Sequence, residues 1–202
     1  MASLRNSDEP LATDDAVGRV LDAARASILA VGWRRTTLTD VARRAGVSRM
    51  TMYRRWPDMQ TLLADLMTRE WATVAPDRSG HGSGVGAAER IATDVVATAQ
   101  ALRTNQLFRR IVEVDPELLL PYLLDRRGRT QDALLDLVRV AIAEGQAAGQ
   151  VRPGDPVVLA RAVVLATHGH VLSAETMTDP DGPDTDDLDA ELRTMVERYL
   201  AP

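Results

Sequence analysis

The sequence predicts an all-α protein with a small N-terminal module and a larger helical domain. Apolar residues recur at intervals of three and four along successive segments, which is typical of helices with one buried face. Capping residues precede these segments, and Gly or Pro interrupts them. A length of 202 residues suits a small module plus one domain of ordinary size. We expect a disordered arm at residues 1–12, a three-helix module at 13–57 and a helical domain at 58–202.

The first helix is expected to begin at Asp14 or Asp15 and to end before Gly32. Its apolar residues follow one another at spacings of four and three, which place them on a single face. This helix should brace the two helices that follow it, and Trp33 should be a packing residue. The apolar face consists of Val17, Leu21, Ala24, Ile28 and Val31.

Two short helices joined by a tight turn are predicted between Thr36 and Trp56. Thr37 precedes the apolar stripe of the first and has Asp40 three residues later, which suits an N-cap with an acidic partner. Gly46 interrupts the stripe, as a residue at positive φ does, and Ser48 can cap the second helix. In the second helix Met52 and Trp56 are one turn apart and can face inward. The stripe of the first helix is Leu38, Val41, Ala42 and Ala45.

The outward face of the second of these helices suits the major groove of DNA. Its polar and Arg side chains are of the kinds that read base edges and hold phosphates. From Arg34 to Trp56 seven Arg and one Asp give a net charge of +6, whereas the whole chain carries −5. Such a concentrated basic patch indicates a nucleic-acid partner. The alternative is a solvated Arg-rich helix pair that binds nothing.

The run T-T-L-T-D-V-A-R-R-A-G-V-S-R-M-T-M-Y-R-R-W-P-D-M-Q-T-L-L resembles the helix-turn-helix of the TetR family of bacterial transcriptional regulators. The resemblance covers residues 14–70 and implies sequence-specific binding to double-stranded operator DNA. One departure is Met59, where the family usually has a Lys that contacts a phosphate. Arg54 or Arg55 is then expected to supply that charge. The predicted DNA-binding residues are Arg34, Thr36, Thr37, Ser48, Arg49, Met50, Thr51, Tyr53, Arg54 and Arg55.

Pro57 should end the recognition helix, and Asp58 can cap a further helix that runs to about Val74. The loop at 75–86 contains Gly82, Gly84 and Ala87, which match the dinucleotide pattern G-x-G-x-x-A. That pattern requires a preceding strand, and a helix is predicted there instead. We therefore interpret the loop as a connector.

More helices are predicted at residues 85–102, 107–114 and 130–150, with a shorter one that Asp115 and Pro116 begin. Pro121 should kink or offset this shorter helix. The resemblance implies that a small-molecule effector binds among the helices at 60–142. Apolar candidates for contacting it are Met67, Trp71, Phe108 and Tyr122.

Residues 157–174 form a helix that is apolar nearly all round, which predicts burial on more than one side. A stripe of small residues along it would let a second helix approach closely. With a last helix at about 188–200, it could form a four-helix homodimer interface. The alternative is that both helices fill the core of one subunit. The predicted interface consists of Ala162, Leu165, Ala166, Gly169, Leu172, Ser173, Leu192, Met195 and Tyr199.

Several kinds of chemistry are not expected. The chain has no Cys, and His168 and His170 are roughly 200° apart on a helix, so they cannot grip one metal ion together. No motif of nucleophilic, zinc-dependent or P-loop chemistry occurs, and no cofactor is predicted. We found no apolar run approaching the roughly 20 residues of a membrane span and no apolar signal core, so we expect a cytoplasmic protein without a membrane partner.

We therefore expect a homodimeric transcriptional regulator, a repressor that a small apolar ligand releases from its operator. An architectural DNA-binding protein without an effector is the main alternative, although it would not need the large helical domain. A helical enzyme acting on a small molecule is the other alternative.

Overall fold

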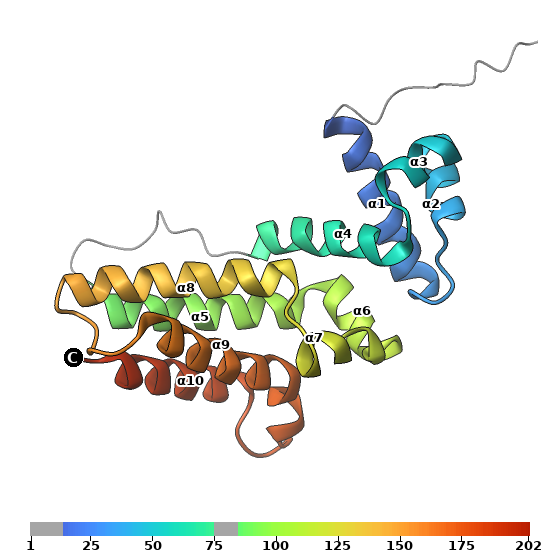
Figure 1. Ribbon diagram of the computed structural model, residues 1–202. Coiled ribbons are helices and arrows are strands. Elements are labelled where there is room, and N and C mark those ends of the chain that lie inside the picture. Colours follow the sequence, from blue (N-terminus) through green and yellow to red (C-terminus); the bar gives the residue numbers. More distant parts are fainter. Residues whose placement is uncertain (1–13, 75–84) are drawn as a thin grey trace, which may run out of the picture. The chain divides into compact units, whose positions relative to one another are not determined.

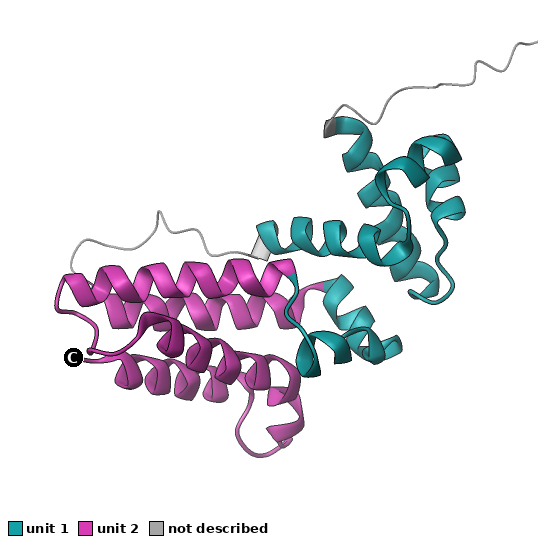
Figure 2. Ribbon diagram, in the orientation of Figure 1, with its two compact units in different colours: residues 1–73, 106–128 teal, residues 74–105, 129–202 magenta. Residues whose placement is uncertain are grey.

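The structure, a computed structural model, describes residues 14–74 and 85–202, and every regular element within these ranges is a helix (Figure 1). The predicted all-α fold is therefore confirmed. The chain divides into two compact units, which Figure 2 distinguishes by colour. Unit 1 comprises residues 1–73 and 106–128, and unit 2 comprises residues 74–105 and 129–202.

Unit 1 contains the three predicted N-terminal helices, the helix after them and a later segment of the chain. Its elements are α1 (Asp14–Val31), α2 (Leu38–Ala45), α3 (Arg49–Arg55), α4 (Met59–Val74), α6 (Gln106–Val114), the 3₁₀ helix η2 (Pro116–Leu118) and α7 (Leu120–Leu124). Leu107 and Ile111 of α6 are fully buried in the same core as Val20, Val41 and Trp56. Consequently α6 completes the core around the helix-turn-helix, although it lies far from it in sequence.

Unit 2 is a bundle of four long helices that run alongside one another in Figure 1. They are α5 (Ala87–Thr104), α8 (Arg129–Ala147), α9 (Pro156–Ser173) and α10 (Thr185–Leu200), and the 3₁₀ helix η3 (Ala174–Met177) follows α9. Gly145 of α8 allows a close approach: a Cβ built there would lie 2.5 Å from Val151 Cγ2 and 2.8 Å from Ala87 Cβ.

The units do not follow the expected boundary between residues 57 and 58. The helix after Pro57 belongs to unit 1, because Leu62, Leu63 and Leu66 are buried in its core. The same applies to 106–128, which was expected to belong with the C-terminal domain. The expected disordered arm and nearly all of the connector at 75–86 lie outside the described residues.

The helices after residue 114 differ in detail from the prediction. Asp115 precedes η2, but its side chain makes no cap hydrogen bond there. Pro121 does not kink one helix; it lies in the first turn of a separate helix, α7, where its missing N–H costs no hydrogen bond. The last helix begins at Thr185, three residues before Leu188, because Asp184 and Asp187 form a capping box.

The segment Pro156–Met177 is long and apolar enough to cross a membrane by length and composition alone. The expectation that the chain has no such run is therefore wrong for this segment. In the structure, however, Leu159, Ala160, Val163 and Val164 pack in the core of unit 2. Packing of one side of α9 in this core thus explains part of the apolar composition of the segment.

A polar cluster joins α5, α9 and α10 inside unit 2. The Asp189 side chain is 4% exposed; Oδ2 accepts hydrogen bonds from Gln100 Nε2 at 2.8 Å and an Arg103 guanidinium nitrogen at 2.6 Å, and Oδ1 lies 2.6 Å from His170 Nε2. Burial alone would raise the pKa of Asp189, but these three partners together hold it below its ordinary value. The carboxylate is therefore ionised, and it ties both predicted interface helices to α5.

Replacing Asp189 should destabilise the protein in a pH-dependent way. Asp189→Ala leaves Arg103 buried without its counter-charge, so the free energy of unfolding should fall by about 3–5 kcal/mol at neutral pH. A lowered folded-state pKa stabilises the protein above the ordinary pKa, and this stabilisation is lost as pH falls through the lowered value. Urea unfolding of variant and wild type should therefore converge in acid. Glu191→Gln, an exposed change on the same helix, is the control; a pH-independent difference would contradict the ionised state.

Candidate nucleic-acid interface

The turn between α2 and α3 is built by local hydrogen bonds, as the sequence predicts. Thr37 Oγ1 accepts a hydrogen bond from the Asp40 N–H at 3.1 Å and donates one to Asp40 Oδ2 at 2.7 Å. Gly46 ends α2 at φ 68°, a left-handed conformation that favours glycine. Ser48 Oγ then accepts from the Thr51 N–H at 3.1 Å and caps α3. These contacts fix the angle at which α3 leaves α2.

The inner face of α3 is held by two fully buried side chains. Met52 and Trp56 are both 0% exposed, which confirms their predicted inward position. The Trp56 indole Nε1–H also donates a hydrogen bond to Asp65 Oδ2 of α4 at 2.9 Å. This bond joins the end of the recognition helix to the following helix, and nothing in the sequence pattern indicated it.

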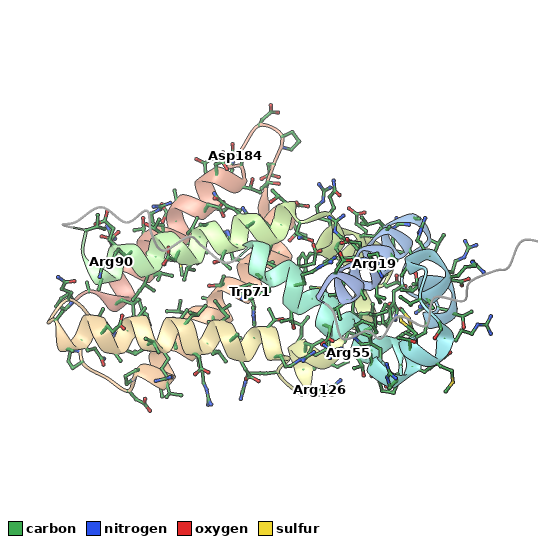
Figure 3. The ribbon with its side chains drawn as sticks, turned by 90° about the horizontal axis from the view of Figure 1, so that it is seen from above. Arg19, Arg55, Trp71, Arg90, Arg126 and Asp184 are labelled. Atoms are coloured by element: carbon green, nitrogen blue, oxygen red, sulfur yellow. The ribbon has the colours of Figure 1, made fainter. Side chains whose placement is uncertain are left out.

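The outer face of α3 carries most of the predicted DNA-binding side chains. Met50 is 83% exposed and Tyr53 49% exposed, and Arg49, Arg54 and Arg55 are exposed as well. The Arg55 guanidinium, labelled in Figure 3, lies 5.8 Å from the centroid of the Trp56 ring. The helix therefore presents a basic surface with one aromatic ring, over a buried apolar inner face.

Two predicted contact residues do not face outward. Thr51 is 8% exposed, and its hydroxyl pairs with Ser48 Oγ at 2.7 Å. Thr36 is 5% exposed, and its hydroxyl donates to the Gly32 carbonyl at 2.8 Å. The outward position expected for Thr51 is therefore wrong, and Thr36, predicted only as a contact, is buried as well. Each hydroxyl is used in a hydrogen bond to a residue three or four positions earlier in the chain.

Charge on the first helix of the motif is partly balanced locally. Asp40 lies 2.7 Å from Arg43, and its bond with Thr37 together with the charges of Arg43 and Arg49 lowers its pKa. Asp40 is therefore a carboxylate that neutralises part of the basic patch. Met59, where the family usually has Lys, is half-buried and packs on the core of unit 1.

Arg34, another predicted DNA contact, is paired with carboxylates from a distant part of the chain. Its Nε donates to Glu117 Oε1 at 2.6 Å and lies 3.8 Å from Asp115 Oδ1. Neither partner was predicted, because more than 80 residues separate them from Arg34 and Asp115 was expected to cap a helix.

The four effector candidates, Met67, Trp71, Phe108 and Tyr122, all lie in unit 1 and are all half-buried. Met67 packs against the same core cluster as Trp56. Trp71, labelled in Figure 3, lies near the end of α4. No effector contact is established by these positions, so the four residues stay predictions.

The predicted dimer residues lie on an outer face of unit 2, with one exception. Leu165 is 73% and Met195 60% exposed, and Tyr199 is 38% exposed. A Cβ built on Gly169 meets nothing within 4 Å. Leu192, however, is 4% exposed and packs in the core of its own unit. The other members are exposed (Ala162, Ala166 and Ser173) or half-buried (Leu172).

The comparisons with known proteins agree with this arrangement. The sequence profile described as "Bacterial regulatory proteins, tetR family" matches residues 20–66, which contain α2 and α3. An HTH-type transcriptional regulator of Mycobacterium bovis is 35% identical over 186 residues, which cover 92% of this chain and 95% of that relative.

Two solved structures show the same fold over nearly the whole chain. A protein with unknown function from Rhodococcus sp. RHA1 has a TM-score of 0.69 at 22% identity and covers 96% of this chain and 100% of its own. The transcriptional repressor QsdR of R. erythropolis, from the TetR family, has a TM-score of 0.63 at 18% identity, with 94% and 98% covered. The chain belongs to the TetR family of bacterial transcriptional regulators and has its helix-turn-helix DNA-binding domain.

Proposed function

We propose that this regulator is a homodimeric repressor that binds an operator in the cytoplasm and leaves it when a small apolar ligand binds. The observation that carries the proposal is the division of α3 into a fully buried inner face and an exposed basic outer face. A helix of this kind fits a major groove. The fold neighbour QsdR is a transcriptional repressor, which supports the direction of regulation by analogy.

Within this proposal Arg49 contacts base edges, and Tyr53 and Thr37 hold phosphates. Arg49 is exposed in the first turn of α3, the end of a recognition helix that contacts base edges. Thr37 caps α2 at its N-terminus, where backbone N–H groups favour a phosphate. Thr51 keeps no base contact in this proposal, because Ser48 holds its hydroxyl.

Two recognition helices are needed to read a two-fold symmetric operator, so dimerisation is part of the function. The exposed apolar side chains of α9 and α10 support an interface on that face, since Val158 and Leu165 of α9 are 58% and 73% exposed and Met195 of α10 is 60% exposed. Small residues at 162, 166 and 169 would allow close helix contact. The interface would include the predicted residues other than Leu192.

Ligand release is proposed to act through α4. In unit 1 this helix is bound to α1 by the ion pairs Arg25–Glu70 at 3.2 Å and Arg69–Asp22 at 2.8 Å, and to the end of α3 by the Trp56–Asp65 bond. Any shift of α4 is therefore transmitted to the recognition helix. The half-buried residues Met67 and Trp71 lie on this helix.

The test is a pair of binding measurements on the full-length chain. A duplex selected by the protein from a randomised library should bind as one dimer to two half-sites, about 34–36 Å apart or a multiple of that distance. A compound found by thermal-shift screening should then bind free and DNA-bound protein with different affinities, typically by 5–150-fold. An effector-independent architectural protein would show no such difference, and catalytic turnover of the compound would indicate an enzyme.

Replacing Arg49 should reduce both affinity and sequence preference. Arg49→Ala is expected to weaken binding to the selected duplex by about 1–3 kcal/mol and to a mixed-sequence duplex by less. Tyr53→Phe should weaken both duplexes alike, because a phosphate contact carries no sequence information. Fluorescence anisotropy with both duplexes measures the difference. Equal losses for Arg49→Ala on the two duplexes would remove its base-reading role.

Gly169→Leu should prevent dimerisation without destabilising the subunit. A Cβ built at this exposed position meets nothing within 4 Å, so the subunit should accommodate a side chain there, and a closely packed partner helix should clash with it. Sedimentation should show a monomer, and affinity for the selected duplex should fall with it. Gly169→Ala, which adds one methyl group, is the milder control. A Leu variant that still sediments as a dimer would place the interface elsewhere.

A further inference from the structure

We propose that Asp115 is a positioning residue for DNA binding, although it lies outside the helix-turn-helix sequence. We also infer that Arg34 belongs to the same cluster as Asp115 and is not a phosphate contact. The inference rests on the DNA-binding function of the family and is independent of the proposed repression and ligand release.

Asp115 is a buried carboxylate with a specific backbone partner. Its residue is 2% exposed, and its Oδ2 accepts a hydrogen bond from the Trp33 N–H at 2.8 Å. A buried charge is costly unless it is paired and hydrogen-bonded, so this contact is a constraint on both segments. It joins positions 82 residues apart in sequence but within one compact unit.

The loop that Asp115 holds leads directly into α2. Gly32 ends α1 at φ 83°, and a Cβ there would lie 3.3 Å from Asp115 Oδ2. The Thr36 N–H donates to the Trp33 carbonyl at 3.0 Å, and the Thr36 hydroxyl donates to the Gly32 carbonyl. The short loop is thus cross-linked within itself, and Thr37, the N-cap of α2, follows it immediately. Moving Trp33 therefore moves the start of α2.

The other side of the contact is equally fixed. The Asp115 N–H donates to the Ile111 carbonyl at 2.9 Å, and the Asp115 carbonyl accepts from the Leu118 N–H at 3.0 Å. Ile111 is 2% exposed in the core of unit 1, and Leu118 packs against that core. Asp115 is thus held on a rigid corner between α6 and η2, which suits a residue that positions another segment.

Arg34 completes the cluster. Its guanidinium bonds to Glu117 through Nε and a second nitrogen and faces Asp115 Oδ1 at 3.8 Å. Hydrogen bonds from its own backbone N–H and from Arg34 lower the pKa of Glu117, so this carboxyl group is charged near neutral pH. The two carboxylates offset the positive charge of the guanidinium, so the cluster as a whole attracts a phosphate only weakly. Arg54 and Arg55 differ, because both are exposed on α3.

The test of Asp115 compares two variants that both remove its negative charge. Asp115→Asn keeps an oxygen that can accept from the Trp33 N–H, whereas Asp115→Ala removes it. With the full-length chain and the duplex that the wild type selects from a randomised library, Asn should stay within about twofold of the wild-type affinity and Ala should lose about tenfold or more. Affinity for a mixed-sequence duplex should change less, because positioning matters most for base contacts.

A folding readout separates positioning from general destabilisation. Hydrogen exchange of the Trp33 amide should accelerate in Asp115→Ala and stay slow in Asp115→Asn, at a temperature where circular dichroism shows both variants folded. The inference is overturned if folded Asp115→Ala binds the selected duplex as tightly as the wild type. It is also overturned if Asn and Ala lose affinity equally, or if both duplexes are weakened by the same factor.

The role of Arg34 is tested by the salt dependence of binding to the mixed-sequence duplex. Arg34→Ala should leave the slope of log K against log salt unchanged, whereas the control double variant Arg54→Ala/Arg55→Ala, which removes both residues expected to supply the phosphate contact, should reduce it by about one or more. A comparable reduction in Arg34→Ala would make Arg34 a phosphate contact and overturn this part. A wild type that binds neither duplex would instead remove the DNA-binding function itself, so the two failures are distinguishable.

Discussion

The orientation of the recognition helix depends on the burial of one indole ring. Trp56 is fully buried at the end of α3, and its Nε1–H donates to Asp65 on α4. Because a large ring in a close-packed core has few alternative positions, the exposed face of α3 is determined by what lies beneath it. Pro57 follows immediately, so the chain turns into α4 at a fixed point. The packing of Trp56 beneath α3, and not the Arg side chains themselves, therefore sets the direction in which the basic surface faces.

Local features of the fold were predictable from the sequence because they depend on neighbouring residues. Thr37, Gly46 and Ser48 act as the spacing of residues indicated, since capping bonds span only a few positions. The inward position of Met52 and Trp56 followed from helical periodicity for the same reason. The sequence therefore predicted that the long helices exist, in which order they follow one another, and how the helix-turn-helix is built.

The residues whose positions were predicted wrongly have a different explanation in common. The position of Thr51 on α3 predicted that it points outward, but it is buried and its hydroxyl pairs with that of Ser48. Leu192 was predicted to lie in the interface with Met195 and Tyr199, but it packs in the core of unit 2. Asp115 was expected to cap a helix because it precedes Pro116, and no pattern in the sequence connects it to Trp33. Burial and long-range pairing depend on which elements meet, and a single sequence does not specify that.

The chain passes from unit 1 to unit 2 and back again, and this affects attempts to exchange DNA-binding domains between relatives. Leu107 and Ile111, which complete the core beneath the DNA-reading helices, come from a segment separated from them by α5 of the other unit. A fragment that stops at residue 74 keeps the whole helix-turn-helix but leaves part of its apolar underside facing water. A chimera spliced at that point would have to supply a matching α6 from the donor protein. Swapping specificity between relatives therefore requires grafting two stretches together, or changing only the exposed residues of α3.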